Sequence, residues 1–165
     1  HVAAELAKAI VDLKEKTSYC TRCGNIAESE LCSICSSVNR SQEVICVVKD
    51  FQDIIAIENT GSYTGQYHVL GGLISPMQGV GPSDIRIEEL IERVSRDNVK
   101  EVIMALSANM EGDTTEFYIS KKLKDSNVSI SSIARGISVG GELEYADEIT
   151  LGRSIVNRVP YQTGK

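Results

Sequence analysis

The sequence predicts an α/β fold: a parallel sheet flanked by helices, with a small four-cysteine finger before it and a helical tail after it. Short β-branched runs at residues 43–48 and 101–106 alternate with helical patterns at residues 50–58 and 84–96. Such alternation is typical of parallel strands joined by crossover helices. At 165 residues, 42% of them hydrophobic, the chain is long enough for one α/β domain and a small accessory unit.

The charge composition limits the kinds of molecule that the chain can bind by itself. The chain has 17 basic and 23 acidic residues, a net charge of −6, and residues 41–138 hold nine basic against fourteen acidic ones. Proteins that neutralise DNA phosphates are usually basic somewhere, so we expect the basic element of any DNA site to lie outside this chain or to appear on assembly. No apolar run approaches the roughly 18 to 20 residues of a membrane helix, and no secretory signal is visible at the start.

The segment before the sheet has two parts. Residues 2–16 carry Leu6, Ile10 and Leu13 at near-helical spacing with charges between them, which predicts an amphipathic helix. Residues 17–40 are polar and have too few large apolar side chains for a core of their own, so we expect a bound metal to stabilise them.

Four of the five cysteines, Cys20, Cys23, Cys32 and Cys35, form the pattern C-x2-C-x8-C-x2-C. Two such knuckles joined by a short loop can bring four thiolates to one tetrahedral Zn²⁺, which then has no open coordination position. We therefore expect a structural zinc, with a disulfide pair or reduced thiols as the alternatives. Cys46 lies inside an apolar run and is expected to be a small core residue.

In the sheet region, strands and helices alternate along the chain. We predict strands over residues 43–48, 67–70, 101–106 and 128–134, and helices over residues 50–58, 84–96 and 114–124. Asp50 is available to cap the first of these helices. In the tail, a Gly-Gly turn at residues 140–141 precedes a helix expected from about Glu144, which could be exchanged between subunits.

The loop at residues 71–83 is rich in glycine and proline but does not match the phosphate-loop pattern. We expect it to carry an exposed apolar flap for a subunit or a partner, formed by Leu73, Ile74, Met77 and Val80. No convincing nucleophile stands out. Three tyrosines, Tyr63, Tyr67 and Tyr118, are expected to be packing or rim residues. His68 is expected to be a polar residue at a strand edge.

Two carboxylates follow the strand predicted over 101–106, at the edge where ligands gather in parallel sheets. Glu111 and Asp113 flank a glycine in a predicted loop, and such a pair could hold a divalent cation. Alternatively, Asp113 caps the next helix, with Glu116 three residues on completing a capping box. The two roles can coexist.

These segments together resemble the bacterial recombination mediator family RecR. The resemblance covers most of the chain and rests on the four-cysteine knuckle at 20–35, VICVVKDFQDIIAIE at 44–58, YHVLGGLISPMQGVGPSDI at 67–85, MEGDTTEFYI at 110–119 and IARGISVGGELEYADEITLGRS at 133–154. It implies that the central part is a Toprim domain, the α/β module also found in topoisomerases and primases. It also implies a role in DNA repair by homologous recombination.

The chain departs from the family pattern in two respects. The resemblance implies an N-terminal helix-hairpin-helix segment whose basic residues touch DNA; it should precede residue 1. Catalytic Toprim domains also hold magnesium with a glutamate after the first strand and a later pair of acids. Lys49 stands at the glutamate position, and Glu111 and Asp113 form the later pair. An ammonium repels a metal ion and pairs with the acids instead, so we expect no catalytic residue and no enzyme.

We accordingly expect four parts: residues 1–16 as the trailing helix of the N-terminal region, 17–40 as a four-cysteine zinc finger, 43–138 as the Toprim domain and 139–165 as an oligomerisation tail. The resemblance implies a ring-forming DNA clamp that works with the RecO and RecF proteins to load recombinase on single-stranded DNA, as a dimer or tetramer at the bacterial nucleoid in the cytoplasm. Glu111 and Asp113 would offer a basic partner an acidic surface. The alternatives are a magnesium-dependent nuclease or phosphoryl-transfer enzyme and a zinc-stabilised interaction module without a DNA role.

Overall fold

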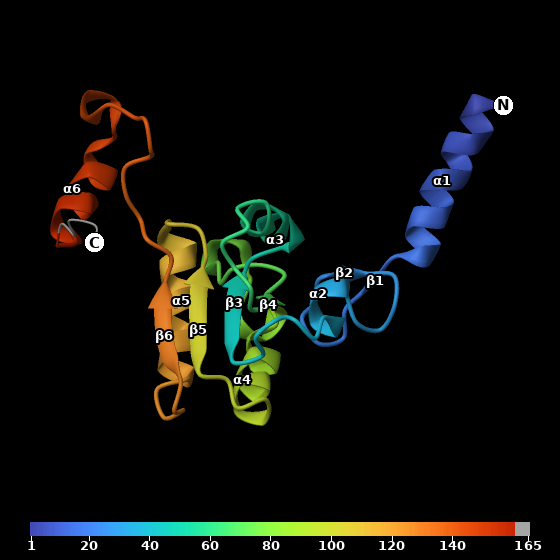
Figure 1. Ribbon diagram of the computed structural model, residues 1–165, viewed down its shortest axis with the longest axis horizontal. Helices are drawn as coiled ribbons and strands as arrows, with labels where there is room; N and C mark the ends of the chain where they lie inside the picture. The colour runs from blue at the N-terminus through green and yellow to red at the C-terminus, as the bar shows by residue number, and fades with distance from the viewer. Residues whose placement is uncertain (161–165) are drawn as a thin grey trace. The chain divides into compact units, whose positions relative to one another are not determined.

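The computed structural model describes residues 1–160 (Figure 1). The chain forms two units, one ending at Ser132 and one beginning at Ile133. The first unit holds helix α1 (Val2–Lys16), the cysteine finger and a four-stranded sheet. As predicted, α1 is a helix, and no residue in it is buried. Among residues 1–160, no helix is both long enough and apolar enough to cross a membrane.

The finger is built from three short elements. Strands β1 (Ser18–Tyr19) and β2 (Ile26–Ala27) pair in an antiparallel manner, and helix α2 (Ser33–Ser36) follows them. A segment without a defined helix or strand then leads from residue 37 to the first strand of the sheet.

The predicted parallel sheet is confirmed. Its strands lie in the order β4-β3-β5-β6, and every neighbouring pair is parallel. The register aligns Val48 of β3 with Val69 of β4 and with Ala105 of β5, so the carboxyl ends of these three strands meet at one edge of the sheet. The bounds are Val44–Val48 for β3, Gln66–Val69 for β4, Glu101–Ala105 for β5 and Ser129–Ser132 for β6.

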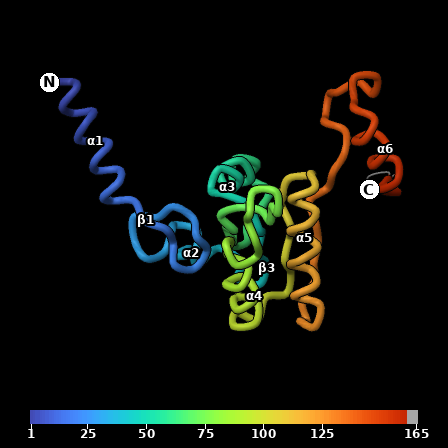
Figure 2. The backbone as a smooth tube through the Cα atoms, turned by 180° about the vertical axis from the view of Figure 1, so that it is seen from behind, coloured from blue at the N-terminus to red at the C-terminus, as the bar shows by residue number. Residues whose placement is uncertain are grey.

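Helices pack against both faces of the sheet, and Figure 2 shows α4 and α5 on the face turned toward the viewer. Successive side chains of a strand point to opposite faces. Ile45 and Val47 of β3 accordingly pack into one core cluster with residues of helices α4 and α5, whereas Cys46 and Val48 pack into a second cluster with Ile54 of α3. A strand buried on both faces explains the continuous apolar run at 44–48. The three helices are α3 (Phe51–Glu58), α4 (Ile87–Arg96) and α5 (Met110–Lys122).

The start of α3 agrees with the prediction. The Asp50 carboxylate accepts hydrogen bonds from the amides of Gln52 and Asp53, and the Asp53 carboxylate accepts one from the Asp50 amide in return. This reciprocal arrangement satisfies amides that have no partner within the first turn. It holds the turn that follows the carboxyl end of β3 in place.

Three predicted helix boundaries were wrong. The helix predicted over 84–96 begins at Ile87, because residues Pro82–Asp84 form a separate 3-10 turn, η2, and Ile85 is extended. The helix predicted over 114–124 begins at Met110. In the second unit, a 3-10 turn, η3 (Leu143–Tyr145), precedes helix α6 (Glu148–Val156), which begins four residues later than predicted.

The loop at 71–83 is not the exposed flap that we predicted. Leu73 and Ile74 are buried in the main core cluster, and Val80 packs against it. Only Met77, in the 3-10 turn η1 (Pro76–Gln78), is exposed. The loop therefore closes the core beyond β4, since its apolar side chains point inward.

The second unit exposes an apolar surface in the described residues. Large apolar side chains of η3 and α6 lie open to solvent, among them Leu143, Tyr145, Ile149, Ile155 and Val156. The Asp147 carboxylate caps α6 by accepting a hydrogen bond from the Thr150 amide. The end of the predicted tail, residues 161–165, lies outside the described residues.

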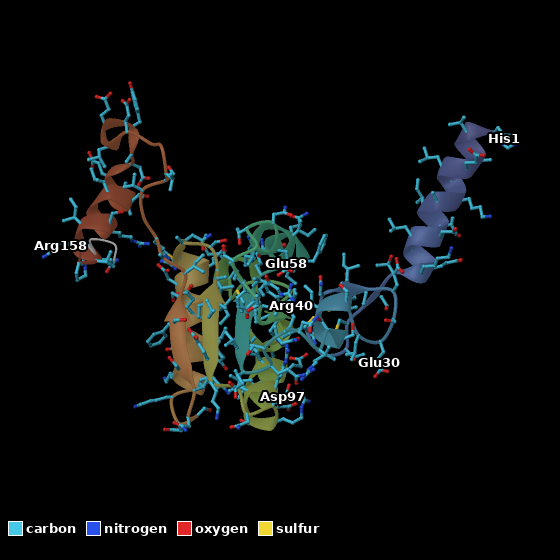
Figure 3. The ribbon with its side chains drawn as sticks, in the orientation of Figure 1. His1, Glu30, Arg40, Glu58, Asp97 and Arg158 are labelled. Atoms are coloured by element: carbon cyan, nitrogen blue, oxygen red, sulfur yellow. The ribbon has the colours of Figure 1, made fainter. Side chains whose placement is uncertain are left out.

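An ion pair joins the segment after the finger to α3 (Figure 3). The Arg40 guanidinium donates to both carboxylate oxygens of Glu58 and to the carbonyl of Gly65. The Tyr67 hydroxyl, on the α3 face of β4, donates to the same carboxylate at 2.6 Å. The Arg40 guanidinium lowers the pKa of Glu58, because it stabilises the ionised carboxylate.

We predict that Glu58→Gln lowers the free energy of unfolding at pH 7 by about 1–3 kcal/mol, because it leaves a partly buried guanidinium without its carboxylate. The pKa of Glu58 is lower in the folded state, so its stabilisation is present above the unfolded-state pKa of about 4.3 and is lost as the pH falls through the folded-state value. Urea unfolding at several pH values measures this difference between the two proteins. Glu88→Gln is the control, because Glu88 pairs with Lys122 at the surface. A difference that grows on acidification would contradict the assignment.

Candidate metal centre and carboxyl-edge pocket

The first cysteine knuckle lies at the end of the β1–β2 hairpin. Cys20 directly follows β1, and the Gly24 amide donates to the Cys20 carbonyl at 2.9 Å. Gly24 has a φ of +77°, which only glycine adopts readily, so it permits the turn immediately after Cys23. The turn aims both thiols of this knuckle into the finger, where they are 1% exposed.

The second knuckle lies at the start of α2. Cys32 is the N-cap residue of this helix, and its sulfur accepts a hydrogen bond from the Cys35 amide. In the first knuckle, the Asn25 amide donates to the Cys23 sulfur in the same way. Amide donors of this kind stabilise the thiolate form that a metal requires.

The four sulfurs lie within 4.8 Å of one another, and all four residues are buried. The Cys23 and Cys32 sulfurs are 3.6 Å apart, close to the edge of about 3.8 Å that a tetrahedron with zinc–sulfur bonds of about 2.3 Å has. All five cysteines of the chain are free thiols, so the disulfide alternative does not apply. The donor set therefore fits one tetrahedral Zn²⁺.

The packed thiols hinder one another's ionisation. The pKa of Cys35 is raised because its thiol shares hydrogen bonds with Cys23 and Cys32, whereas the pKa of Cys32 is lowered because it accepts from its neighbours. Four thiolates cannot coexist in this volume without a cation. A bound Zn²⁺ would supply that charge and hold the two knuckles together.

Apart from the cysteines, the finger has little core. Its buried cluster consists of the four cysteines and Ala27, with Ile34 partly buried against it. Folding of a segment with so few apolar contacts draws its free energy from the metal–sulfur bonds. The prediction that Cys46 is a core residue is also confirmed, because it packs in the sheet on the α3 face.

A second polar site lies at the carboxyl edge of the sheet. A pocket of about 430 Å³ there is lined by residues from the ends of β3 and β5, the 71–85 loop and the start of α5, including Lys49 and Glu111. Lys49 is exposed and directly follows β3. The structure thus brings Lys49 and Glu111 to one pocket, because the strands that precede them end at the same edge of the sheet.

Glu111 is already hydrogen bonded. The Ser75 hydroxyl donates to its carboxylate at 2.6 Å, and nearby the Thr115 hydroxyl accepts a hydrogen bond from the Ile74 amide. These contacts fasten the 71–83 loop to α5. Among residues 1–160, the four cysteines form the one group of three or more metal-binding side chains that lie close together.

The predicted cap of α5 was wrong. Asn109 is the N-cap residue and accepts a hydrogen bond from the Gly112 amide, so Glu111 and Asp113 lie within the first turn and not in a loop. Side chains two residues apart on a helix are about 200° apart around its axis. Asp113 does not line the pocket that Glu111 lines, within the described part of the chain.

Gly112 has a packing role that the sequence did not reveal. A Cβ atom at this position would lie 1.9 Å from the Ser107 carbonyl oxygen, so only glycine allows the first turn of α5 to approach the loop after β5. An asparagine three residues before this glycine was the available signal for the true cap. The Asp-x-x-Glu pattern at 113–116 resembles a capping box and led to the wrong prediction of the cap.

The three tyrosines and the histidine predicted to be packing or strand-edge residues lie within the fold. Tyr67 is fully buried, and Tyr63 and Tyr118 pack against the core clusters, as predicted. His68 lies on the edge strand β4, as predicted, and it is completely buried there. Desolvation lowers the pKa of His68 to about 3, so the ring is neutral at physiological pH. Its Nε2 lies 2.7 Å from the Arg86 carbonyl, to which it donates.

We predict one zinc per chain, and we predict that Cys35→Ser abolishes its retention and lowers the stability of residues 17–40 by several kcal/mol. Cys46→Ala is the matched control, because it removes an equally buried thiol from the sheet and not from the finger. Elemental analysis gives the metal content, and limited proteolysis reports whether the finger unfolds. Zinc retained in full by Cys35→Ser would contradict the four-thiolate assignment.

Three family models match successive parts of the chain. The RecR four-cysteine zinc finger domain matches residues 17–37, the Toprim domain matches residues 43–134 and the RecR C-terminal segment matches residues 136–159. The Toprim match alone covers more than half of the chain. The zinc-finger match contains all four clustered cysteines, so the finger is a four-cysteine zinc finger by both geometry and sequence.

Whole-chain relatives agree with these matches. The recombination protein RecR of Flavobacterium psychrophilum is 55% identical over 157 residues, which are 95% of this chain and 76% of the relative. The protein of the same name from Bacteroides thetaiotaomicron is 59% identical over 150 residues, 91% of this chain and 73% of the relative. With the zinc finger, the Toprim sheet and the C-terminal segment in the same order, the chain belongs to the RecR family of recombination proteins.

Proposed function

We propose that the chain is a recombination mediator that acts as a DNA clamp and adaptor and catalyses no reaction. It would work with the RecO and RecF proteins to load recombinase on single-stranded DNA, at the nucleoid in the bacterial cytoplasm. Membership of the RecR family supports the recombination role. The single observation that supports a binding role over a catalytic one is the Toprim edge, where Lys49 and Glu111 line the same pocket.

Lys49 works against metal-dependent phosphoryl transfer. Two-metal chemistry needs several carboxylates to bind its cations. An ammonium at this edge repels a cation, and the Glu111 carboxylate is occupied by the Ser75 hydroxyl. The pocket is therefore poorly suited to hold magnesium, and we propose that it has no catalytic residue.

The C-terminal unit supports self-association. Exposed apolar side chains on one short helix and the turn before it are typical of a surface that another chain covers. Ile149 and Val156 are seven residues apart on α6 and so share a face. We propose that the chain forms a homo-oligomer, a dimer or a tetramer, through residues 139–165. We also propose that residues 1–16 are the trailing helix of the N-terminal region, residues 17–40 the zinc finger and residues 43–138 the Toprim domain.

A closed ring explains how an acidic chain can hold DNA. A ring retains DNA by enclosing it, so it needs few phosphate contacts. The chain spans about three quarters of its relatives' length, and we propose that basic residues of an N-terminal helix-hairpin-helix segment supply such contacts as are needed. Salt dependence of retention would then be shallow, because few counterions are released.

We predict that the protein joined to that segment stays on closed circular single-stranded DNA and is lost when the same DNA is linearised. Gel filtration before and after a single site-specific cut measures retention, and magnesium is present throughout. This chain without the segment serves as the comparison and should bind DNA much more weakly. Equal retention on circular and linear DNA would contradict the clamp, and DNA breaks made by the protein would favour the nuclease alternative.

The first turn of α5 carries the residues proposed to dock RecO, with Glu111 on the pocket side and Asp113 on another side of the helix. We predict that the double variant Glu111→Gln, Asp113→Asn weakens RecO binding at least several-fold, because it removes two charges that attract a basic partner. Glutamine can still accept the Ser75 hydrogen bond, so the loop stays in place. Glu92→Gln, an exposed carboxylate on α4, is the control. Calorimetry measures the affinity, and unchanged binding by the double variant would remove this surface from the proposal.

A further inference from the structure

The finger covers the open edge of the sheet. The Leu70 amide donates to Val48 of the neighbouring strand β3, so the adjacent Val69 amide points away from β3. There it donates to the Cys23 carbonyl of the finger at 2.7 Å. The Tyr67 carbonyl, two residues earlier, accepts from the Arg93 guanidinium of α4 at 2.6 Å. The first cysteine knuckle and Arg93 therefore satisfy neighbouring backbone groups on the outer side of β4.

The second knuckle contacts the same strand. The Gln66 side-chain amide donates to the carbonyl of Ile34, which lies between Cys32 and Cys35. Both halves of the zinc centre are thus joined to β4 by hydrogen bonds to residues that are ligands or adjoin them. An uncovered edge strand is prone to pairing with other chains, so this cover has a structural consequence beyond the finger.

Three arginines converge on one carboxylate beside this junction. Asp97, which follows α4, accepts from Arg22 of the finger at 3.1 Å and from Arg96 at 2.9 Å, and the Arg93 Nε lies 3.6 Å from it. Asp97 is labelled in Figure 3. Arg22 belongs to the first knuckle, between Cys20 and Cys23. Three guanidinium charges against one carboxylate leave this group with a formal charge of +2 next to the finger.

Arg93 is the least compensated of the three. It is 2% exposed, and its Nε has no hydrogen-bond partner among the described residues. Desolvation lowers the pKa of Arg93, and the nearby Cys35 side chain is the largest influence that raises it. A buried guanidinium with one neutral acceptor and a shared carboxylate is costly unless more negative charge lies close by.

We propose that Arg93 is the counter-charge of the zinc centre, so that zinc binding and docking of the finger on the edge of β4 stabilise each other. Zn²⁺ with four thiolates carries a formal charge of −2, which is opposite in sign to the charge of the buried Arg93 guanidinium. Arg93 touches no ligand, so it acts as a positioning residue through β4 and through its charge. The argument rests on the four-cysteine zinc finger and does not depend on the clamp function.

Linkage makes the coupling reciprocal. If docking raises the affinity of the finger for zinc by some factor, zinc raises the affinity of the finger for the sheet by the same factor. Loss of zinc would therefore expose the outer edge of β4, since the Val69 amide would lose its acceptor. The sheet itself would remain folded, because its two core clusters do not include the cysteine ligands.

The first test compares zinc affinities of three variants by competition with a chromogenic chelator. We expect Arg93→Met to weaken zinc binding about 10- to 100-fold, the usual effect of losing an outer partner of a metal site. Arg93→Lys keeps the charge and should stay within a few-fold of the natural protein. Arg96→Met is the matched control, because Arg96 pairs with the same Asp97 but is 65% exposed, and it should change little. Equal losses in Arg93→Lys and Arg93→Met, or no loss in either, would overturn the proposal.

The second test follows the Val69 amide by hydrogen exchange with and without a chelator. We expect exchange at Val69 to accelerate when zinc is removed, while amides of β3 and β5 stay protected. A Val69 amide that remains protected without zinc would overturn the coupling. If Arg93→Met does not fold, Arg22→Met serves instead, because Arg22 lies on the finger side and is 21% exposed. It should weaken zinc binding in the same direction, and an unchanged affinity would count against the proposal.

Discussion

The four-thiolate centre is the constraint on which the N-terminal half of the structure depends. The finger buries little besides its cysteines and Ala27, so its fold cannot come from apolar burial. The same centre determines what lies against the sheet, because Cys23 and Ile34 contact β4 through their carbonyls. A metal site that is structural for its own segment thereby also protects the edge of the Toprim sheet.

At the carboxyl edge, the parallel register has a different consequence. Strand ends that meet in one place bring side chains from distant parts of the chain to one pocket. In this chain the pocket receives Lys49 in addition to Glu111, and the glycine-rich loop is fastened there through Ser75. The geometry of the α/β module is kept, while an ammonium and a carboxylate, Lys49 and Glu111, line the pocket at its edge.

Prediction from sequence succeeded where the signal was local. The strand at 44–48 and the cap at Asp50 follow from side chains within a few residues of each other, and the finger follows from cysteine spacing. It failed where the role of a residue depended on how segments of the chain fold against one another. The glycine between Glu111 and Asp113 is required by the Ser107 carbonyl, and the apolar residues of the 71–83 loop were misjudged because their partners lie in α4 and α5.

The sequence by itself determined the alternation of strands and helices and the four zinc-binding cysteines, because periodicity and spacing are properties of short segments. Its motifs also resemble those of the RecR family. Only the tertiary structure decided that Asp97 joins Arg22 to Arg93 and that the finger covers β4. Arg22 and Asp97 are 75 residues apart in the chain. No local pattern marks such a pair, since its charges become partners only after the sheet has placed the finger and α4 side by side.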